Sequence, residues 1–114
     1  PNGLYDQTNH NPIVRKGITA TPIWNNFKGK PDFLIDGGVY PGSSGSPVFI
    51  YNQGSYPTAE GISIGTRLHF VGVIYETSIS TANNQTTFLN LGIAINSIVI
   101  YDELKLYVKK LLDN

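Results

Sequence analysis

Short runs of apolar and β-branched residues alternate along this chain with clusters rich in Gly, Asn, Pro and Ser. This alternation is typical of the strands and turns of an antiparallel all-β barrel or sandwich. It predicts strands over residues 13–20, 33–35, 46–51, 68–75 and 89–95. The polar or glycine-containing stretches 52–66 and 77–87 are predicted to be surface loops, with an irregular or helical patch at 59–64.

The period of the pattern changes near the C-terminus. From Ser97 to Leu112, apolar residues recur every three or four positions, at Ile98, Tyr101, Leu104, Val108 and Leu111. This spacing predicts an amphipathic helix over about residues 97–112. Acidic residues near its start (Asp102, Glu103) and basic residues near its end (Lys109, Lys110) complement the helix dipole. We expect this helix to cover the barrel rather than to bind a partner.

Composition narrows the classes of protein. The chain has 114 residues, no net charge and no cysteine, so it is one domain or less and has neither disulfides nor a cysteine-ligated metal site. Scattered Lys and Arg argue against nucleic acid or an anionic membrane as the partner. No apolar run is long enough to cross a bilayer, and no His lies among acidic residues. We expect no metal and no cofactor, and the compartment stays undetermined.

The stretch Gly42-Ser43-Ser44-Gly45-Ser46-Pro47 carries the candidate chemistry. Gly42 and Gly45 can adopt backbone angles that residues with a Cβ atom resist. A turn of this kind exposes the Ser44 hydroxyl and directs the N–H groups of Gly42 and Ser44 toward one point. Acyl transfer uses such an arrangement, because two N–H donors stabilise the negative charge that develops on the carbonyl oxygen.

This stretch resembles the Gly-Asp-Ser-Gly-Gly-Pro signature around the nucleophile of trypsin-like serine peptidases. Further segments, in the same order, resemble the bacterial high-temperature-requirement peptidases of that fold. They are residues 1–4 and 14–20 (PNGL and VRKGITA), 33–36 (FLID), 70–74 (FVGVI) and 91–96 (LGIAIN). Ser43 stands where trypsins have an aspartate that pairs with a new N-terminal amine, so activation by that route is not expected. Ser46 replaces the usual second glycine.

The resemblance implies that residues 1–114 form a single C-terminal subdomain of a bacterial enzyme, and it leaves open whether that enzyme is located in the cytoplasm or the periplasm. This subdomain would be the antiparallel Greek-key β-barrel of a two-barrel trypsin-like fold, and it would end in the helix. Ser44 would be the nucleophile, and the Gly42 and Ser44 N–H groups the oxyanion hole. The specificity pocket would be lined by Gly38, Val39, Tyr40 and Pro41, and an extended substrate would pair at Ile74, Tyr75 and Glu76.

Gly38 falls where trypsins carry the acidic group of the specificity pocket, so a preference for Arg or Lys is not expected. Val39 and the strand at 91–95 indicate a small or medium apolar pocket instead.

The histidine and aspartate of the family's triad lie in the N-terminal barrel, which would precede Pro1. His10 lies in a polar stretch and His69 opens a predicted strand, and neither matches the position of the base. Asp36, at a strand end, is expected to cap a turn. We therefore expect a fragment whose inter-barrel surface is apolar and exposed, so that it self-associates or holds its nucleophile loop away from the active form.

Three functions remain open at this point. The leading one is a serine endopeptidase acting on peptides or proteins. The alternative is a peptidase-like pseudoenzyme that binds peptides or a partner without cleavage. A third is a self-sufficient β-sandwich module for adhesion or carbohydrate binding, in which the Gly-Ser turn is coincidental.

We predict that the 114-residue chain alone hydrolyses no casein and reacts negligibly with a fluorophosphonate probe. In a serine protease of another fold, loss of the base lowers turnover on the order of a millionfold. Without a base, the Ser44 hydroxyl stays protonated and is a weak nucleophile. Rapid covalent labelling of Ser44 in this chain, detected by mass spectrometry, would contradict the prediction.

Overall fold

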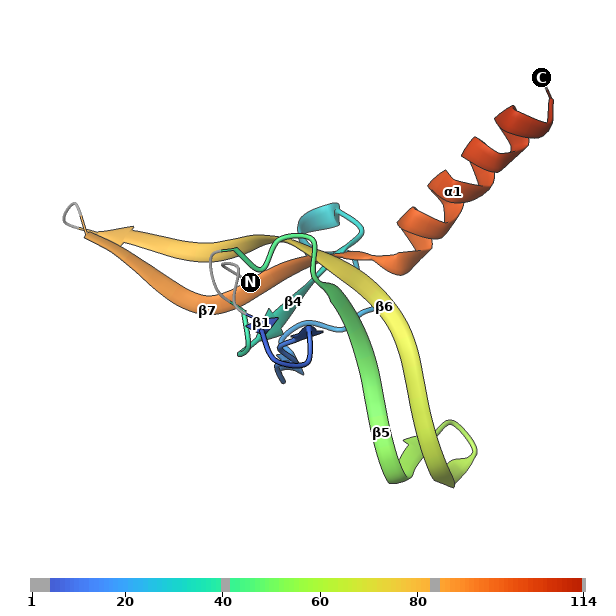
Figure 1. Cartoon of the computed structure of the whole chain (residues 1–114), viewed down its shortest axis with the longest axis horizontal. Coiled ribbons are helices and arrows are strands. Elements are labelled where there is room, and N and C mark those ends of the chain that lie inside the picture. The colour runs from blue at the N-terminus through green and yellow to red at the C-terminus, as the bar shows by residue number, and fades with distance from the viewer. Residues whose placement is uncertain (1–4, 40–41, 83–84, 114) are drawn as a thin grey trace.

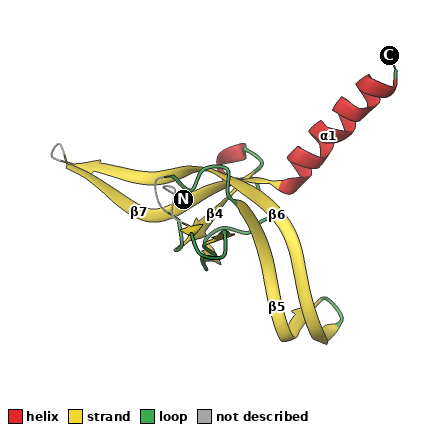
Figure 2. Cartoon of the chain, viewed as in Figure 1, coloured by secondary structure: helices red, strands yellow, loops and turns green. Residues whose placement is uncertain are grey.

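The computed structural model describes residues 5–39, 42–82 and 85–113. It is mostly β-sheet, curled into a half-barrel, with one C-terminal helix (Figures 1 and 2). This agrees with the predicted all-β class. The elements are β1 (Tyr5–Asp6), β2 (Asn11–Pro12), β3 (Ile18–Thr19), a 3₁₀ turn (Phe27–Gly29), β4 (Asp32–Asp36), β5 (Pro47–Thr58), β6 (Gly61–Ala82), β7 (Gln85–Asn96) and α1 (Ser97–Leu112).

The main sheet has five strands in the order β3-β4-β7-β6-β5, and every neighbouring pair is antiparallel. β1 and β2 pair separately as a short hairpin. β4 lies beside β7 along its full length, from Asp32 opposite Ile95 to Asp36 opposite Leu91. The long connection from β4 to β5 carries the Gly42–Pro47 stretch, so the turn lies at the start of β5 and beside β6.

Two predicted loops are strands. Residues 52–58 continue β5 and pair with residues 61–67 of β6, leaving only Ala59 and Glu60 as the turn. The loop was predicted because glycines are typical of turns. In the structure, however, Gly54 and Gly65 are not in a turn but lie opposite each other in the paired strands β5 and β6. Residues 77–82 and 85–87 likewise extend β6 and β7. This stretch is polar but rich in threonine, whose β-branched side chain favours strands.

The strand predicted over 13–20 is also wrong in its extent, since only Ile18–Thr19 pair with β4. Gly17 lies directly against the backbone beyond the end of β4. A Cβ atom at Gly17 would come within 2.7 Å of the Gly37 carbonyl oxygen and 2.8 Å of the Asp36 carbonyl oxygen. The two backbones therefore meet too closely at Gly17 for any larger residue to fit there.

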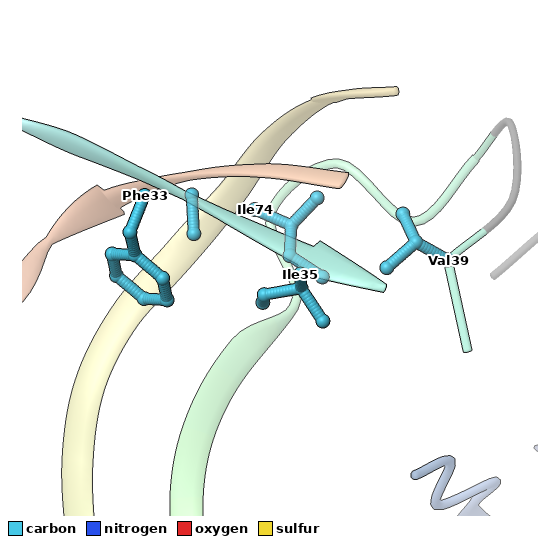
Figure 3. Close-up of a cluster of buried hydrophobic side chains, with 5 residues drawn as sticks. Phe33, Ile35, Val39 and Ile74 are labelled. Atoms are coloured by element: carbon cyan, nitrogen blue, oxygen red, sulfur yellow. The ribbon is translucent and has the colours of Figure 1, made fainter. Parts of the chain in front are cut away.

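A small core lies on one face of β4, β6 and β7. It consists of Phe33, Ile35, Val39, Ile74 and Ala94 (Figure 3). Two glycines make room for its larger members. A Cβ atom at Gly72 would come within 2.9 Å of the Phe33 ring, and one at Gly92 within 2.8 Å of the Val39 methyl groups. The absence of side chains at these positions lets Phe33 and Val39 pack directly on the strand backbones.

The β5–β6 hairpin presents an apolar face and a polar face, because side chains alternate along each strand. Phe49 and Phe70 are opposite each other on the apolar face, with ring centroids 5.8 Å apart. On the polar face, the Arg67 guanidinium donates to the Asn52 side-chain oxygen at 2.7 and 2.9 Å and lies over the Tyr56 ring. Beyond Ile50 the apolar face is exposed, whereas Asn52, Tyr56 and Arg67 on the polar face are partly buried.

The predicted helix forms over the expected residues. Asn96 caps its start, where the Asn96 side-chain oxygen accepts a hydrogen bond from the Ile98 N–H at 3.0 Å. Lys109 and Lys110 lie in its last turn. The expected position is wrong, however, because α1 projects away from the sheet instead of covering it (Figure 1). Among the described residues, no helix is long and apolar enough to cross a membrane.

The projecting helix and hairpins make the chain extended. Its radius of gyration is 17.0 Å, against about 13 Å for a compact domain of this length.

We predict that Phe33→Ala strongly destabilises the fold. Phe33 is fully buried, and truncating a buried phenylalanine costs about 3–5 kcal/mol, which is a large share of the stability of a small domain. Urea denaturation followed by circular dichroism measures the change. Phe49→Ala is the matched control, since Phe49 is half-exposed on the hairpin. An equal loss in both variants would contradict the assigned core.

Candidate functional site

Gly42 and Gly45, the two glycines of the Gly42–Ser46 turn, adopt backbone angles that residues with a Cβ atom resist, as the sequence predicts. Gly42 has φ 94° and Gly45 has φ 91°, a region that strains residues with a Cβ atom. A Cβ atom at Gly45 would meet nothing within 4 Å, so the requirement for glycine there comes from the backbone angle alone. Between these glycines, Ser43 is buried and Ser44 is exposed. The turn therefore presents the Ser44 hydroxyl at the surface.

Backbone hydrogen bonds fasten this turn to β6. The Gly45 N–H donates to the Ile74 carbonyl at 2.7 Å, and the Ile74 N–H donates to the Ser46 carbonyl at 3.0 Å. Within the turn, the Ser46 N–H donates to the Ser43 carbonyl at 3.0 Å. Because the Ile74 side chain belongs to the core, the position of Ser44 is tied to the best-packed part of the molecule.

The Ser44 hydroxyl donates a hydrogen bond to the Tyr75 carbonyl at 3.1 Å. A backbone carbonyl accepts this bond but cannot remove the proton, so the contact does not activate Ser44 as a nucleophile. Neither histidine lies where it could remove the Ser44 proton instead. His69 lies inside β6 opposite Ile50, about 16 Å along the strand from Ile74, and His10 lies in the turn between β1 and β2. Neither histidine therefore serves as the base for Ser44 in this structure.

The N–H groups predicted to form the oxyanion hole lie on this turn. In the part of the chain that the structure describes, the Gly42 and Ser44 N–H groups donate no hydrogen bond to the protein, in contrast to those of Gly45 and Ser46. Gly42 and Ser44 are also exposed. Their N–H groups are therefore open to an acceptor on a bound molecule.

Tyr75 lies at a β-bulge, where the register of β6 against β7 shifts between Ile74 and Glu76. Its hydroxyl donates to an Asp32 carboxylate oxygen at 2.5 Å. Asp32 opens β4 and is buried. The hydrogen bond to Asp32, then burial, and then the negative charges of Asp32 and Glu76 raise the pKa of Tyr75 to about 12.

This Asp32–Tyr75 pair was not found from the sequence. The only signal was an aspartate at the start of an otherwise apolar strand, and such residues are usually turn caps. The pair links β4 to the bulge across β7, and the same bulge supplies the carbonyl that accepts from Ser44.

Of the four predicted pocket residues, the structure describes two, Gly38 and Val39. Val39 is buried against Gly92, and Gly38 has φ 69° and lies so close to the Lys16 carbonyl that a Cβ atom would not fit. Val39 thus fills the space beside β7 and leaves little room for a large group there. Tyr40 and Pro41 lie outside the described residues.

The predicted substrate-pairing residues are adjacent to Ser44. Both backbone polar groups of Ile74 are used by the turn, and its side chain is buried. Tyr75 and Glu76 are exposed. Asp36 is the exposed last residue of β4. Within the described ranges, no group of three or more His, Cys, Asp or Glu side chains could hold a metal ion.

In comparisons with known proteins, the chain matches no family model, no curated protein and no solved structure. The functional argument therefore rests on the residues and geometry of this chain.

We predict that Tyr75→Phe lowers the free energy of unfolding by about 1–3 kcal/mol, because it leaves the buried Asp32 carboxylate without this donor. The pKa of Tyr75 is higher in the folded chain than the ordinary 10.0. The stabilisation is therefore fully present below pH 10 and is lost as the pH rises toward 12. Urea midpoints between pH 7 and pH 11.5 measure both effects.

Tyr51→Phe is the control for this prediction. The Tyr51 hydroxyl donates to the exposed Gln53 side chain at 3.3 Å, so its removal should change stability little. Equal effects of the two substitutions, or an unchanged alkaline profile in Tyr75→Phe, would show that the Asp32–Tyr75 bond does not stabilise the fold.

Proposed function

We propose that this chain is the C-terminal half of a trypsin-like serine endopeptidase, with Ser44 as its nucleophile. The observation that carries the proposal is the Gly42–Ser46 turn. It presents an exposed serine hydroxyl between two left-handed glycines, next to two N–H groups that make no hydrogen bond within the described part of the chain. Acyl transfer needs both a nucleophile and N–H donors that are free to bind the oxyanion.

The strand order supports the same proposal. β5, β6 and β7 follow one another as hairpins. The connection that holds Ser44 runs from β4 to β5, and β4 lies beside β7 at the far side of these hairpins. Three consecutive antiparallel strands, with a fourth beside the far one, have the connectivity of a Greek key. We infer that the half-barrel is the Greek-key barrel of the two-barrel peptidases.

In the proposed reaction, a histidine from the N-terminal barrel removes the Ser44 proton. The Ser44 hydroxyl first leaves the Tyr75 carbonyl. Its oxygen then attacks the substrate carbonyl carbon, and the Gly42 and Ser44 N–H groups stabilise the oxyanion. The C–N bond breaks as the histidine returns the proton to the leaving amine. Water, activated by the same histidine, hydrolyses the acyl-enzyme and regenerates Ser44. No cofactor is needed.

The substrate of this reaction is an extended peptide or protein segment. The Tyr75 carbonyl contacts the Ser44 hydroxyl, and Tyr75 and Glu76 are exposed residues of β6, with which an extended chain could pair. Val39 fills the space beside Gly92, which favours small or medium apolar side chains next to the cleaved bond.

One observation favours the alternative, a pseudoenzyme that binds peptides without cleaving them. The Ser44 hydroxyl is bonded to a backbone carbonyl and not to a base. In such a protein the same turn and exposed strand would bind a peptide, and no acyl-enzyme would form.

The test uses the full-length protein, including any residues that precede Pro1. We expect a fluorophosphonate probe to label it at Ser44 and peptide hydrolysis to be measurable. Ser44→Ala should abolish labelling and lower turnover on the order of a millionfold. Ser55→Ala, an exposed serine on the β5–β6 hairpin, should change neither.

Hydrolysis that persists in Ser44→Ala would overturn the peptidase proposal. Peptide binding without labelling or hydrolysis in the native protein would establish the pseudoenzyme instead.

A further inference from the structure

Tyr75 is the residue of β6 that the pairing with β7 leaves out. Ile74 lies opposite Ala94, and Glu76 lies opposite the next residue of β7, Ile93. Between them, Tyr75 has no partner residue in the described part of β7. A bulge of this kind gives the strand one extra residue, whose φ and ψ angles are not fixed by the ladder. The direction of the Tyr75 carbonyl therefore depends on what else holds this residue.

The side chain of Tyr75 provides that constraint. It reaches from β6 across β7 to β4, where its hydroxyl donates to the Asp32 carboxylate at 2.5 Å. Asp32 is itself held in place, because it is only 6% exposed and pairs with Ile95 of β7. Its N–H also donates to the Lys30 carbonyl at 2.7 Å. The extra residue of the bulge is thus fastened to a strand on the far side of β7.

This contact bears on Ser44 because Tyr75 also supplies the acceptor for the Ser44 hydroxyl. The Tyr75 carbonyl accepts that hydrogen bond at 3.1 Å, and the turn that holds Ser44 makes two backbone hydrogen bonds to Ile74. The turn therefore rests on two consecutive residues of β6. Core packing fixes the first of them, Ile74, and the bond to Asp32 fixes the second.

We propose that Asp32 and Tyr75 are positioning residues of the candidate site, and that the hydrogen bond between them holds the Ser44 hydroxyl in place on its turn. The two side chains act through the Tyr75 carbonyl and take no part in bond making. Placing a catalytic group about 1 Å away from its productive position lowers a rate about a hundredfold. The consequence for catalysis rests on the peptidase proposal, whereas the consequence for the turn does not.

Amide hydrogen exchange of the full-length protein, followed by NMR, tests the effect on the turn. In Tyr75→Phe we expect faster exchange of the Gly45 and Ile74 N–H groups, which join the turn to β6. The reference is the Ala20 N–H, which donates to the Leu34 carbonyl at 2.8 Å on the side of β4 away from β7. The acceleration at the turn should be at least about tenfold greater than at the reference, because the turn opens locally.

A link that only stabilises the sheet gives a different result. Loss of such a link promotes opening of the whole fold and accelerates exchange equally at the turn and at the reference. Equal acceleration would therefore overturn the proposal.

The rate at which a fluorophosphonate probe labels Ser44 in the full-length protein tests the effect on reactivity. The probe is small and needs no pairing with β6, so its rate separates the placement of Ser44 from the binding of a peptide. We expect Tyr75→Phe and Asp32→Leu each to lower the second-order rate constant by about tenfold to a hundredfold. The double variant should be no slower than either single variant, because both substitutions remove the same hydrogen bond.

Two further variants serve as controls. Asp32→Asn should keep most of the native rate, since its side-chain amide oxygen still accepts from the Tyr75 hydroxyl. Tyr51→Phe removes a hydroxyl that donates to the exposed Gln53 side chain, and it should change neither the labelling rate nor the exchange. Circular dichroism verifies that each variant is folded at the temperature of the assay.

The outcomes separate this proposal from the proposed function. An unchanged or raised labelling rate in Tyr75→Phe, or a rate for Asp32→Asn as low as that for Asp32→Leu, would overturn the positioning role. If the native full-length protein is not labelled at all, the peptidase proposal fails. The exchange measurement then decides by itself whether the pair positions the turn.

Discussion

The pair of backbone hydrogen bonds between the Gly42–Ser46 turn and Ile74 is the constraint on which the candidate site depends. Through the Gly45 N–H and the Ser46 carbonyl, the turn is held to β6. The side chain of the same Ile74 packs with Phe33, Ile35, Val39 and Ala94 in the core. Anything that loosens the core therefore moves Ser44, and the position of Ser44 is no more stable than the packing of β4, β6 and β7.

That packing depends on glycines as much as on the apolar side chains of the core. Gly72 and Gly92 allow the Phe33 ring and Val39 to approach the strand backbones, and the Asp32–Tyr75 bond adds a polar link across β7 on the same three strands. The well-packed region is small, and the hairpins and α1 extend beyond it. A fold with so little buried surface per residue is marginal by itself, which is the physical reason to expect partners for its exposed apolar surfaces.

Local chemistry made part of the structure predictable. The helix at Ser97–Leu112 followed from its three- and four-residue spacing, and the left-handed glycines of the turn followed from the Gly-Ser-Ser-Gly order. β4 was predicted to within one residue at each end, because it is a short apolar run between turn residues. The long hairpins were missed because their local sequence features indicate loops. Their glycines and polar residues are typical of loops, and only cross-strand pairing, as between Gly54 and Gly65, makes them strands.

The sequence by itself determined which residues can turn and which can form a helix, and it singled out Ser44 as the candidate nucleophile, because these inferences depend on a residue and its near neighbours. Only the tertiary structure decided that Ser44 bonds to the Tyr75 carbonyl, that Asp32 binds Tyr75, and that α1 leaves the sheet with its apolar side exposed. Those outcomes depend on which strands become neighbours. Strand order is set by many contacts between residues far apart in the chain, and a short stretch of sequence does not specify those contacts.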